Sequence, residues 1–201
     1  MKRILALFLA AAPMAVLADP TSWNVDPAHS NASFTVRHLV ISNVRGEFQK
    51  MSGAVKLDDK DLAKSSVEAT IETASIETRI PDRDKHLKSP DFFDVEKYPT
   101  ITFKSTKVES AGKGKLKVTG DLTMKGVTKP VVLAVDGPTA EIKDPGGNTR
   151  RGFAATTTIN RRDFGLNWSK VVEAGPVVGD EVKIEIEAEL IKQAAGKTAQ
   201  K

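Results

Sequence analysis

The sequence predicts an all-β protein, an eight-stranded antiparallel barrel with a short helix inserted between two strands over the barrel. Apolar and polar residues alternate with a period of two along about eight segments, so each strand has one solvent-facing side. The strands are long, and few are interrupted by proline. Their apolar faces mix small and large residues, which would leave space inside a barrel. An antiparallel sandwich has a similar strand count and remains open as an alternative.

The clearest strand lies near the C-terminus, where EVKIEIEAEL alternates at every position from 181 to 190. Seven other segments show the pattern, and 46–57 is the least regular of them. Ala69, Gly120 and Ala155 are the small residues on the predicted inward faces. In chain order, these segments are 33–38, 46–57, 67–73, 101–104, 115–124, 131–135 and 153–159.

Residues 78–99 interrupt the strand pattern and predict the inserted helix. Pro81 suits the first helical turn, acidic residues follow it, and basic residues come at the end of TRIPDRDKHLKS. Ser89 and Pro90 then end the helix. Residues 160–168 form a second irregular segment.

Phe92 and Phe93 follow this helix directly. Adjacent side chains on one strand face opposite ways, so both rings can enter the interior only from a helical or irregular segment. We expect the two phenylalanines to form part of a lid over the barrel mouth. The alternative is that both simply plug the core.

The first 18 residues have the features of a secretory signal peptide. Lys2 and Arg3 precede a short apolar run, and small residues allow cleavage after Ala18. The run is too short to span a membrane. We therefore expect a signal peptide at 1–18, one domain at 19–191 and a flexible tail at 192–201.

Composition excludes several classes of function. The chain has no cysteine, which rules out disulfides, thiolate catalysis and thiolate metal sites. Its net charge is +4, of which Lys2 and Arg3 contribute two, and the charges alternate along strands, so no nucleic-acid surface is expected. Nucleophile-elbow, phosphate-loop and dinucleotide motifs are missing, and no catalytic residue or cofactor is predicted.

The three histidines are His29, His38 and His86, and their spacing is not that of a metal site, so none is predicted. His38 shares a strand face with Phe34 and Val36 and should point inward. It is then either a hydrogen-bonded core histidine or a polar anchor in a ligand cavity.

Several motifs together resemble the YceI-like family of bacterial proteins over residues 23–191. Two of them are long and specific: 83–103 and 120–131. The motifs are DPAHSNASFTVRH (26–38), RGEF (45–48), SIET (75–78), RDKHLKSPDFFDVEKYPTITF (83–103), GDLTMKGVTKPV (120–131) and INRRDFGL (159–166).

This resemblance implies a lipocalin-like barrel whose apolar tunnel holds a polyisoprenoid, a quinone or an acyl lipid. With the signal peptide, it implies a periplasmic protein that contacts the membrane transiently. An exposed strand edge or an apolar mouth would also allow two barrels to pair as a homodimer.

On this basis we expect a periplasmic carrier of a long-chain lipid, with polar anchors His38, Arg83 and His86. Two other functions stay open: a lipid-modifying enzyme with His38 or His86 as general base, and a stress-related structural barrel without ligand. The predicted tunnel residues are Phe34, Val36, Phe48, Val67, Ile71, Phe92, Phe93, Phe103, Leu122, Phe164 and Trp168.

Overall fold

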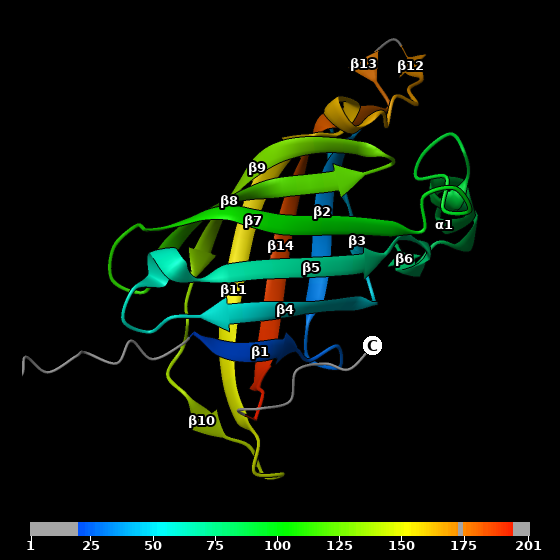
Figure 1. Ribbon diagram of the computed structural model, residues 1–201. Helices are drawn as coiled ribbons and strands as arrows, with labels where there is room; N and C mark the ends of the chain where they lie inside the picture. The colour runs from blue at the N-terminus through cyan, green and yellow to red at the C-terminus, as the bar shows by residue number, and fades with distance from the viewer. Residues whose placement is uncertain (1–19, 173–174, 195–201) are drawn as a thin grey trace, which may run out of the picture.

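The computed structural model describes residues 20–172 and 175–194 (Figure 1). The predicted signal peptide and residues 195–201 of the predicted tail lie outside this part of the chain. The last strand ends at Lys192, and the backbone N–H of Gln193 donates to the carbonyl of Ser22 at 2.8 Å.

Strands make up most of the described chain, and the helical segments are short. The strands are β1 (Thr21–Val25), β2 (Asn31–His38), β3 (Ser42–Phe48), β4 (Met51–Leu57), β5 (Ser66–Glu72), β6 (Ile76–Glu77), β7 (Thr100–Ser110), β8 (Lys115–Met124), β9 (Val127–Asp136), β10 (Ile142–Lys143), β11 (Thr149–Asn160), β12 (Val171–Val172), β13 (Gly175–Pro176) and β14 (Val178–Lys192). The helical segments are α1 (Pro81–Lys88) and the 3-10 turns η1 (Leu62–Lys64), η2 (Thr73–Ser75) and η3 (Arg161–Phe164).

Eight strands close into an antiparallel barrel, in the order β11, β9, β8, β7, β5, β4, β1 and β14, with β14 pairing back onto β11. The predicted fold class is therefore confirmed. Figure 1 shows β4, β5 and β7 crossing in front of β11 and β14, with α1 beside the ends of β5 and β7. Strands β2, β3 and β6 extend the sheet beyond the closed ring.

The identity of the eight strands differs from the prediction in two places. The predicted strand 46–57 is two strands, β3 and β4. Phe48 and Met51 are both buried, and residues three apart on one unbroken strand face opposite sides, so the chain must bend between them. Strand β1 was not predicted, because its five residues contain only two apolar side chains, Trp23 and Val25.

Strand β14 explains how both β1 and β2 fit on one edge. It is fifteen residues long and pairs with β11 along one edge, from Glu181 to Ile191. On the other edge, β2 pairs with its first part and β1 with its last part. The predicted strand 33–38 therefore belongs to an extension of the barrel, not to the closed ring.

Two glycines make room for aromatic rings in the interior. A Cβ at Gly120 would collide with the ring of Phe103, and a Cβ at Gly46 would collide with the ring of Phe34. The sequence suggested that Gly120 leaves open interior space, and this was wrong, because Phe103 fills that space. Ala69 and Ala155, the other two small residues, do line open space.

Candidate functional site: two adjoining apolar cavities

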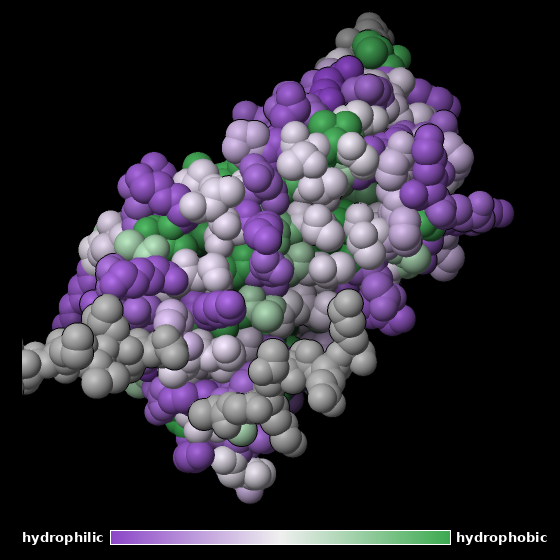
Figure 2. Space-filling view, viewed as in Figure 1, coloured by the Kyte–Doolittle hydropathy of each residue, from purple (hydrophilic) through white to green (hydrophobic). Residues whose placement is uncertain are grey.

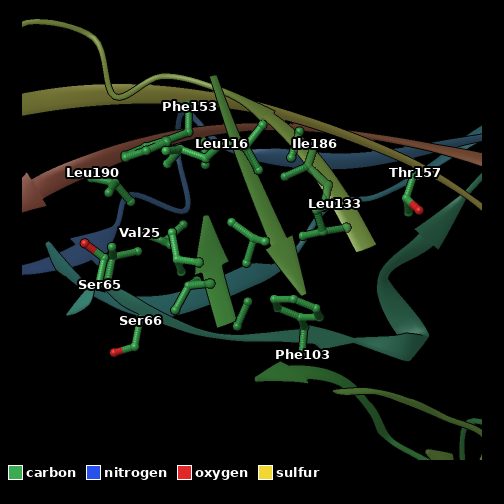
Figure 3. Close-up of a pocket in the computed structure, with 18 of the residues that line it drawn as sticks. Val25, Ser65, Ser66, Phe103, Leu116, Leu133, Phe153, Thr157, Ile186 and Leu190 are labelled. Atoms are coloured by element: carbon green, nitrogen blue, oxygen red, sulfur yellow. The ribbon is translucent and has the colours of Figure 1, made fainter. Parts of the chain in front are cut away.

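The closed barrel contains an apolar cavity with a volume of about 170 Å³. Figure 3 shows Phe103, Leu116 and Leu133 converging on this space from different strands. Ser65, Ser66 and Thr157 are the lining residues that carry hydroxyls, and Figure 3 shows the oxygens of Ser65 and Ser66 directed away from the apolar side chains. This cavity, called cavity 1 below, therefore presents a hydrocarbon surface.

Cavity 2 has a volume of about 140 Å³ and lies between the β2–β3 extension and the segment around α1. Its lining is mostly aliphatic and aromatic. Representative lining residues are Phe34, Val36, Phe48, Leu87, Phe92 and Phe93.

The two cavities adjoin each other. Leu122 on β8 and both Ile184 and Ile186 on β14 line both of them. Apolar space thus lies on both sides of these three side chains, in the barrel centre and toward α1. Such an apolar lining suits a hydrocarbon chain better than a polar molecule.

Nine of the eleven predicted tunnel residues line a cavity. Val67 and Phe103 line cavity 1, Leu122 lines both cavities, and the other six line cavity 2: Phe34, Val36, Phe48, Ile71, Phe92 and Phe93. Phe164 is 2% exposed and packs in the same core cluster as these rings, with Trp168 against that cluster. For all eleven residues, direct contact with a ligand stays a prediction.

The rings of Phe92 and Phe93 diverge and pack against two different aromatic side chains. The Phe92 N–H donates to the carbonyl of Ser89 and the Phe93 N–H donates to that of Leu87, so the chain turns tightly after α1. The Phe93 ring meets Phe48 edge-on at 5.7 Å, whereas the Phe92 ring lies 5.2 Å from Trp168. Both rings therefore close the α1 end of cavity 2.

Hydrogen bonds hold this α1 segment in place. The Asp84 carboxylate accepts from the N–H and the hydroxyl of Thr78, at 2.9 and 2.5 Å. Arg83 donates to the same hydroxyl and to the Thr78 carbonyl. Thr78 is 3% exposed, so these bonds are largely shielded from water.

The three predicted polar anchors lie outside the linings of both cavities. His38 sits at the end of β2, paired with Val178. Arg83 is engaged with Thr78. His86 lies 3.0 Å from the Asp91 carboxylate and packs edge-on against Phe92 and Trp168. Their role toward a head group stays a prediction.

Arg161 is a lining residue of cavity 2 that sequence reasoning missed. Its side chain is 4% exposed, and its guanidinium donates to the carbonyls of Leu166, Trp168, Val178 and Gly179 and to the Asp180 carboxylate. Burial lowers its pKa. Since these bonds occupy all five N–H donors, Arg161 clamps the η3 segment to β14.

Arg161 and its neighbour Arg162 share one carboxylate. Both arginines contact Asp180 at the start of β14, at 3.1 and 2.7 Å. The sequence did offer a signal for this contact, because Asp180 stands at the start of the next long strand after the two arginines.

A group of charged residues lies beyond the other end of cavity 1. Asp26, His29 and Glu189 place ligand atoms within 4.8 Å of one another, as a metal site requires. However, Arg150 Nη1 contacts both carboxylates, at 2.5 Å for Asp26 and 3.0 Å for Glu189. The carboxylate oxygens that would bind a metal ion therefore already accept hydrogen bonds from the Arg150 guanidinium.

The same guanidinium sets the protonation of its partners. Hydrogen bonds from Arg150 and then His29 hold the pKa of Asp26 well below its usual range. Arg150 and Asn148 lower the pKa of Asp144 to about 2. Both carboxylates are thus ionised at neutral pH. Asp26 ties β11 to the chain after β1, and Asp144 ties it to the turn after β10.

Fold and site together define a class: an antiparallel barrel with an apolar interior, closed at one end by a helical segment. Within the described residues, no helix has the length and apolar character needed to cross a membrane. The profile of the YceI-like domain matches residues 23–190, and the chain belongs to this family.

Relatives and solved structures agree with this assignment. A UPF0312 protein of Vibrio cholerae is 40% identical over 187 residues, covering 92% of this chain and 97% of its own. Burkholderia cenocepacia BcnA superimposes with a TM-score of 0.71 at 28% identity, covering 82% of this chain and 98% of its own. A polyisoprenoid binding domain from Saccharophagus degradans, implicated in plant cell wall breakdown, shares the fold with a TM-score of 0.63 at 17% identity, covering 86% and 99%.

Proposed function

We propose that this protein is a periplasmic binding and carrier protein for a polyisoprenoid or a similar long-chain amphiphilic lipid. The observation that carries the proposal is that two apolar cavities adjoin in the interior, with Leu122, Ile184 and Ile186 lining both. The polyisoprenoid binding domain with the same fold supports this ligand class. The predicted signal peptide supports the periplasmic setting.

The energetics favour a hydrocarbon ligand. Burying the five carbons of one isoprene unit contributes roughly 3–4 kcal/mol before the costs of ordering and association. An empty cavity is itself unfavourable: at about 24 cal/mol per Å³, the 170 Å³ of cavity 1 corresponds to roughly 4 kcal/mol of lost packing. A bound chain would recover part of that loss.

The function needs no catalytic group, since uptake and release of a lipid break no covalent bond. Among the described residues that line cavity 2, Arg161 is the charged one, and its polar atoms are all engaged by protein acceptors. We therefore propose binding without turnover.

One observation favours the enzyme as a second candidate. His86 and Asp91 form the histidine–carboxylate pair that orients a general base. Turnover of a bound lipid by purified protein, lost in His86→Ala, would support this candidate against the carrier.

Native mass spectrometry of protein purified from the periplasm, followed by organic extraction, tests the proposal. The expected result is an added mass that releases as one apolar lipid. A bare mass, unchanged after quinones and polyprenols are offered, would contradict the carrier function and favour a structural barrel without ligand. Recovery of the protein from the cytoplasm alone would contradict the periplasmic setting.

A further inference from the structure

Two hairpins at one end of the molecule lie against each other and expose aliphatic side chains. Figure 1 shows β12 and β13 beyond the ends of β2 and β14, and Figure 2 shows hydrophobic surface at the same end. The Leu39 N–H donates to the Val177 carbonyl at 3.0 Å, which joins the β2–β3 turn to the chain after β13. We call four side chains there the tip patch: Val40 (54% exposed), Ile41 (75%), Val171 (78%) and Val172 (44%).

The β2–β3 turn carries aliphatic residues where the backbone disfavours them. Leu39 and Val40 have φ of +49° and +61°. Glycine and asparagine adopt this left-handed region readily, whereas a β-branched residue such as valine is strained there. A turn shaped only for stability would carry the favoured residues. The strain therefore points to a use for exposed aliphatic side chains at this turn.

The two chain segments that meet at the tip patch also contribute to the lining of cavity 2. Val36 lines that cavity four residues before Val40 on the same hairpin. Val178 also lines it and follows Val177, the residue that holds the turn. An apolar route out of cavity 2 in this direction would end at the tip patch.

Charge and size indicate what the tip patch contacts. Arg37 and Lys170 are exposed and lie beside the two hairpins, and Arg37 donates to the Val40 carbonyl at 3.0 Å. Asp180, at the start of β14, is paired with two arginines. Four side chains are too few for a stable protein interface, which buries about 800 Å² on each partner. A few exposed aliphatic side chains with Arg37 and Lys170 beside them suit insertion into an anionic bilayer surface.

We propose that the tip patch docks this protein on the surface of an anionic phospholipid bilayer. Docking at this point would place the end of cavity 2 against the membrane. The transfer of a lipid through that contact rests on the proposed function, whereas the docking itself does not.

Flotation with vesicles of phosphatidylglycerol and phosphatidylcholine tests the docking. Two double variants remove the aliphatic surface: Val40→Gly with Ile41→Thr, and Val171→Thr with Val172→Thr. Each should lower the fraction bound by about tenfold, because each removes several inserted carbons. Ile142→Thr is the matched control, since Ile142 is 62% exposed on β10 at the opposite end (Figure 1), and it should bind as the parent protein does.

Further measurements separate docking from misfolding and from the carrier function. Glycine adopts the positive φ of Val40 without strain. The Val40→Gly, Ile41→Thr variant should therefore keep at least the urea-unfolding midpoint of the parent protein. Vesicle binding of both double variants equal to that of Ile142→Thr would overturn the docking proposal. So would a concentration-dependent dimer that these variants dissociate while vesicle binding is absent. Tip-dependent vesicle binding by a protein that carries no lipid would support docking and contradict the carrier function.

Discussion

Ala155→Leu should fill cavity 1 and separate stability from ligand binding. Ala155 lies on β11, is 8% exposed and lines the cavity opposite the strand that carries Phe103. The substitution adds three carbons, whose burial contributes at most about 2.4 kcal/mol at about 0.8 kcal/mol each. Steric adjustment in a packed core costs about 1–3 kcal/mol, but the 170 Å³ of open space reduces that cost. We expect the free energy of unfolding to rise by up to about 2 kcal/mol.

Ligand occupancy should change in the opposite direction. The added side chain occupies the space that a hydrocarbon chain would take, so lipid retained in native mass spectra should fall at least severalfold. Urea unfolding of the lipid-free protein measures the stability. Ala154→Leu is the matched control, because Ala154 is the adjacent residue on β11 and faces the other side of the sheet.

One result would refute this reasoning. If Ala155→Leu lost more than about 1 kcal/mol of stability and kept full lipid occupancy, cavity 1 would be neither open space nor the ligand site. A loss of occupancy in Ala154→Leu equal to that in Ala155→Leu would show that the effect is not specific to the cavity.

Three further changes test the charged and polar groups. Asp26→Asn should cost about 2–4 kcal/mol at neutral pH by disrupting the pair with Arg150. The pKa of Asp26 in the folded protein lies below the ordinary value of 3.8, so its contribution to stability is full above pH 3.8 and fades as the pH falls further. Parent and variant stabilities from urea unfolding should therefore converge toward pH 2, and a constant difference would contradict the assignment. Arg161→Leu should lose about 2–4 kcal/mol in thermal or urea unfolding, since several buried carbonyls lose their donor; an unchanged midpoint would refute the clamp. His38→Ala should weaken lipid binding in a titration at nearly unchanged thermal stability if His38 anchors the head group, whereas equal losses of both would mark a structural histidine.

The helical insertion was the part of the site that local sequence patterns predicted well. Pro81 begins α1, acidic residues occupy its first turn, and Ser89 ends it, as expected. These signals act between neighbours in the chain, so they can be recognised without the fold. The argument that Phe92 and Phe93 need an irregular backbone was also local, and both side chains line cavity 2.

The strand register was predicted only where alternation was unbroken. Along β14 and β8 the pattern placed the inward faces correctly, including Ile184 and Leu122. It failed between Phe48 and Met51, where a bend restores the inward direction of both side chains. A bend of this kind depends on which strands lie alongside, and period-two counting does not contain that information.

The sequence by itself determined the class of fold, the position of the helical insertion and the apolar character of the interior. Only the tertiary structure decided which side chains share a cavity. Phe103 fills the space left by Gly120, so that glycine gives no open volume, whereas Ala155 does. Tertiary structure also placed Arg161 among carbonyls from β14 and brought two distant turns together in the tip patch. The physical reason is that alternation and capping depend on near neighbours, whereas open volume and hydrogen-bond partners depend on residues far apart in the chain.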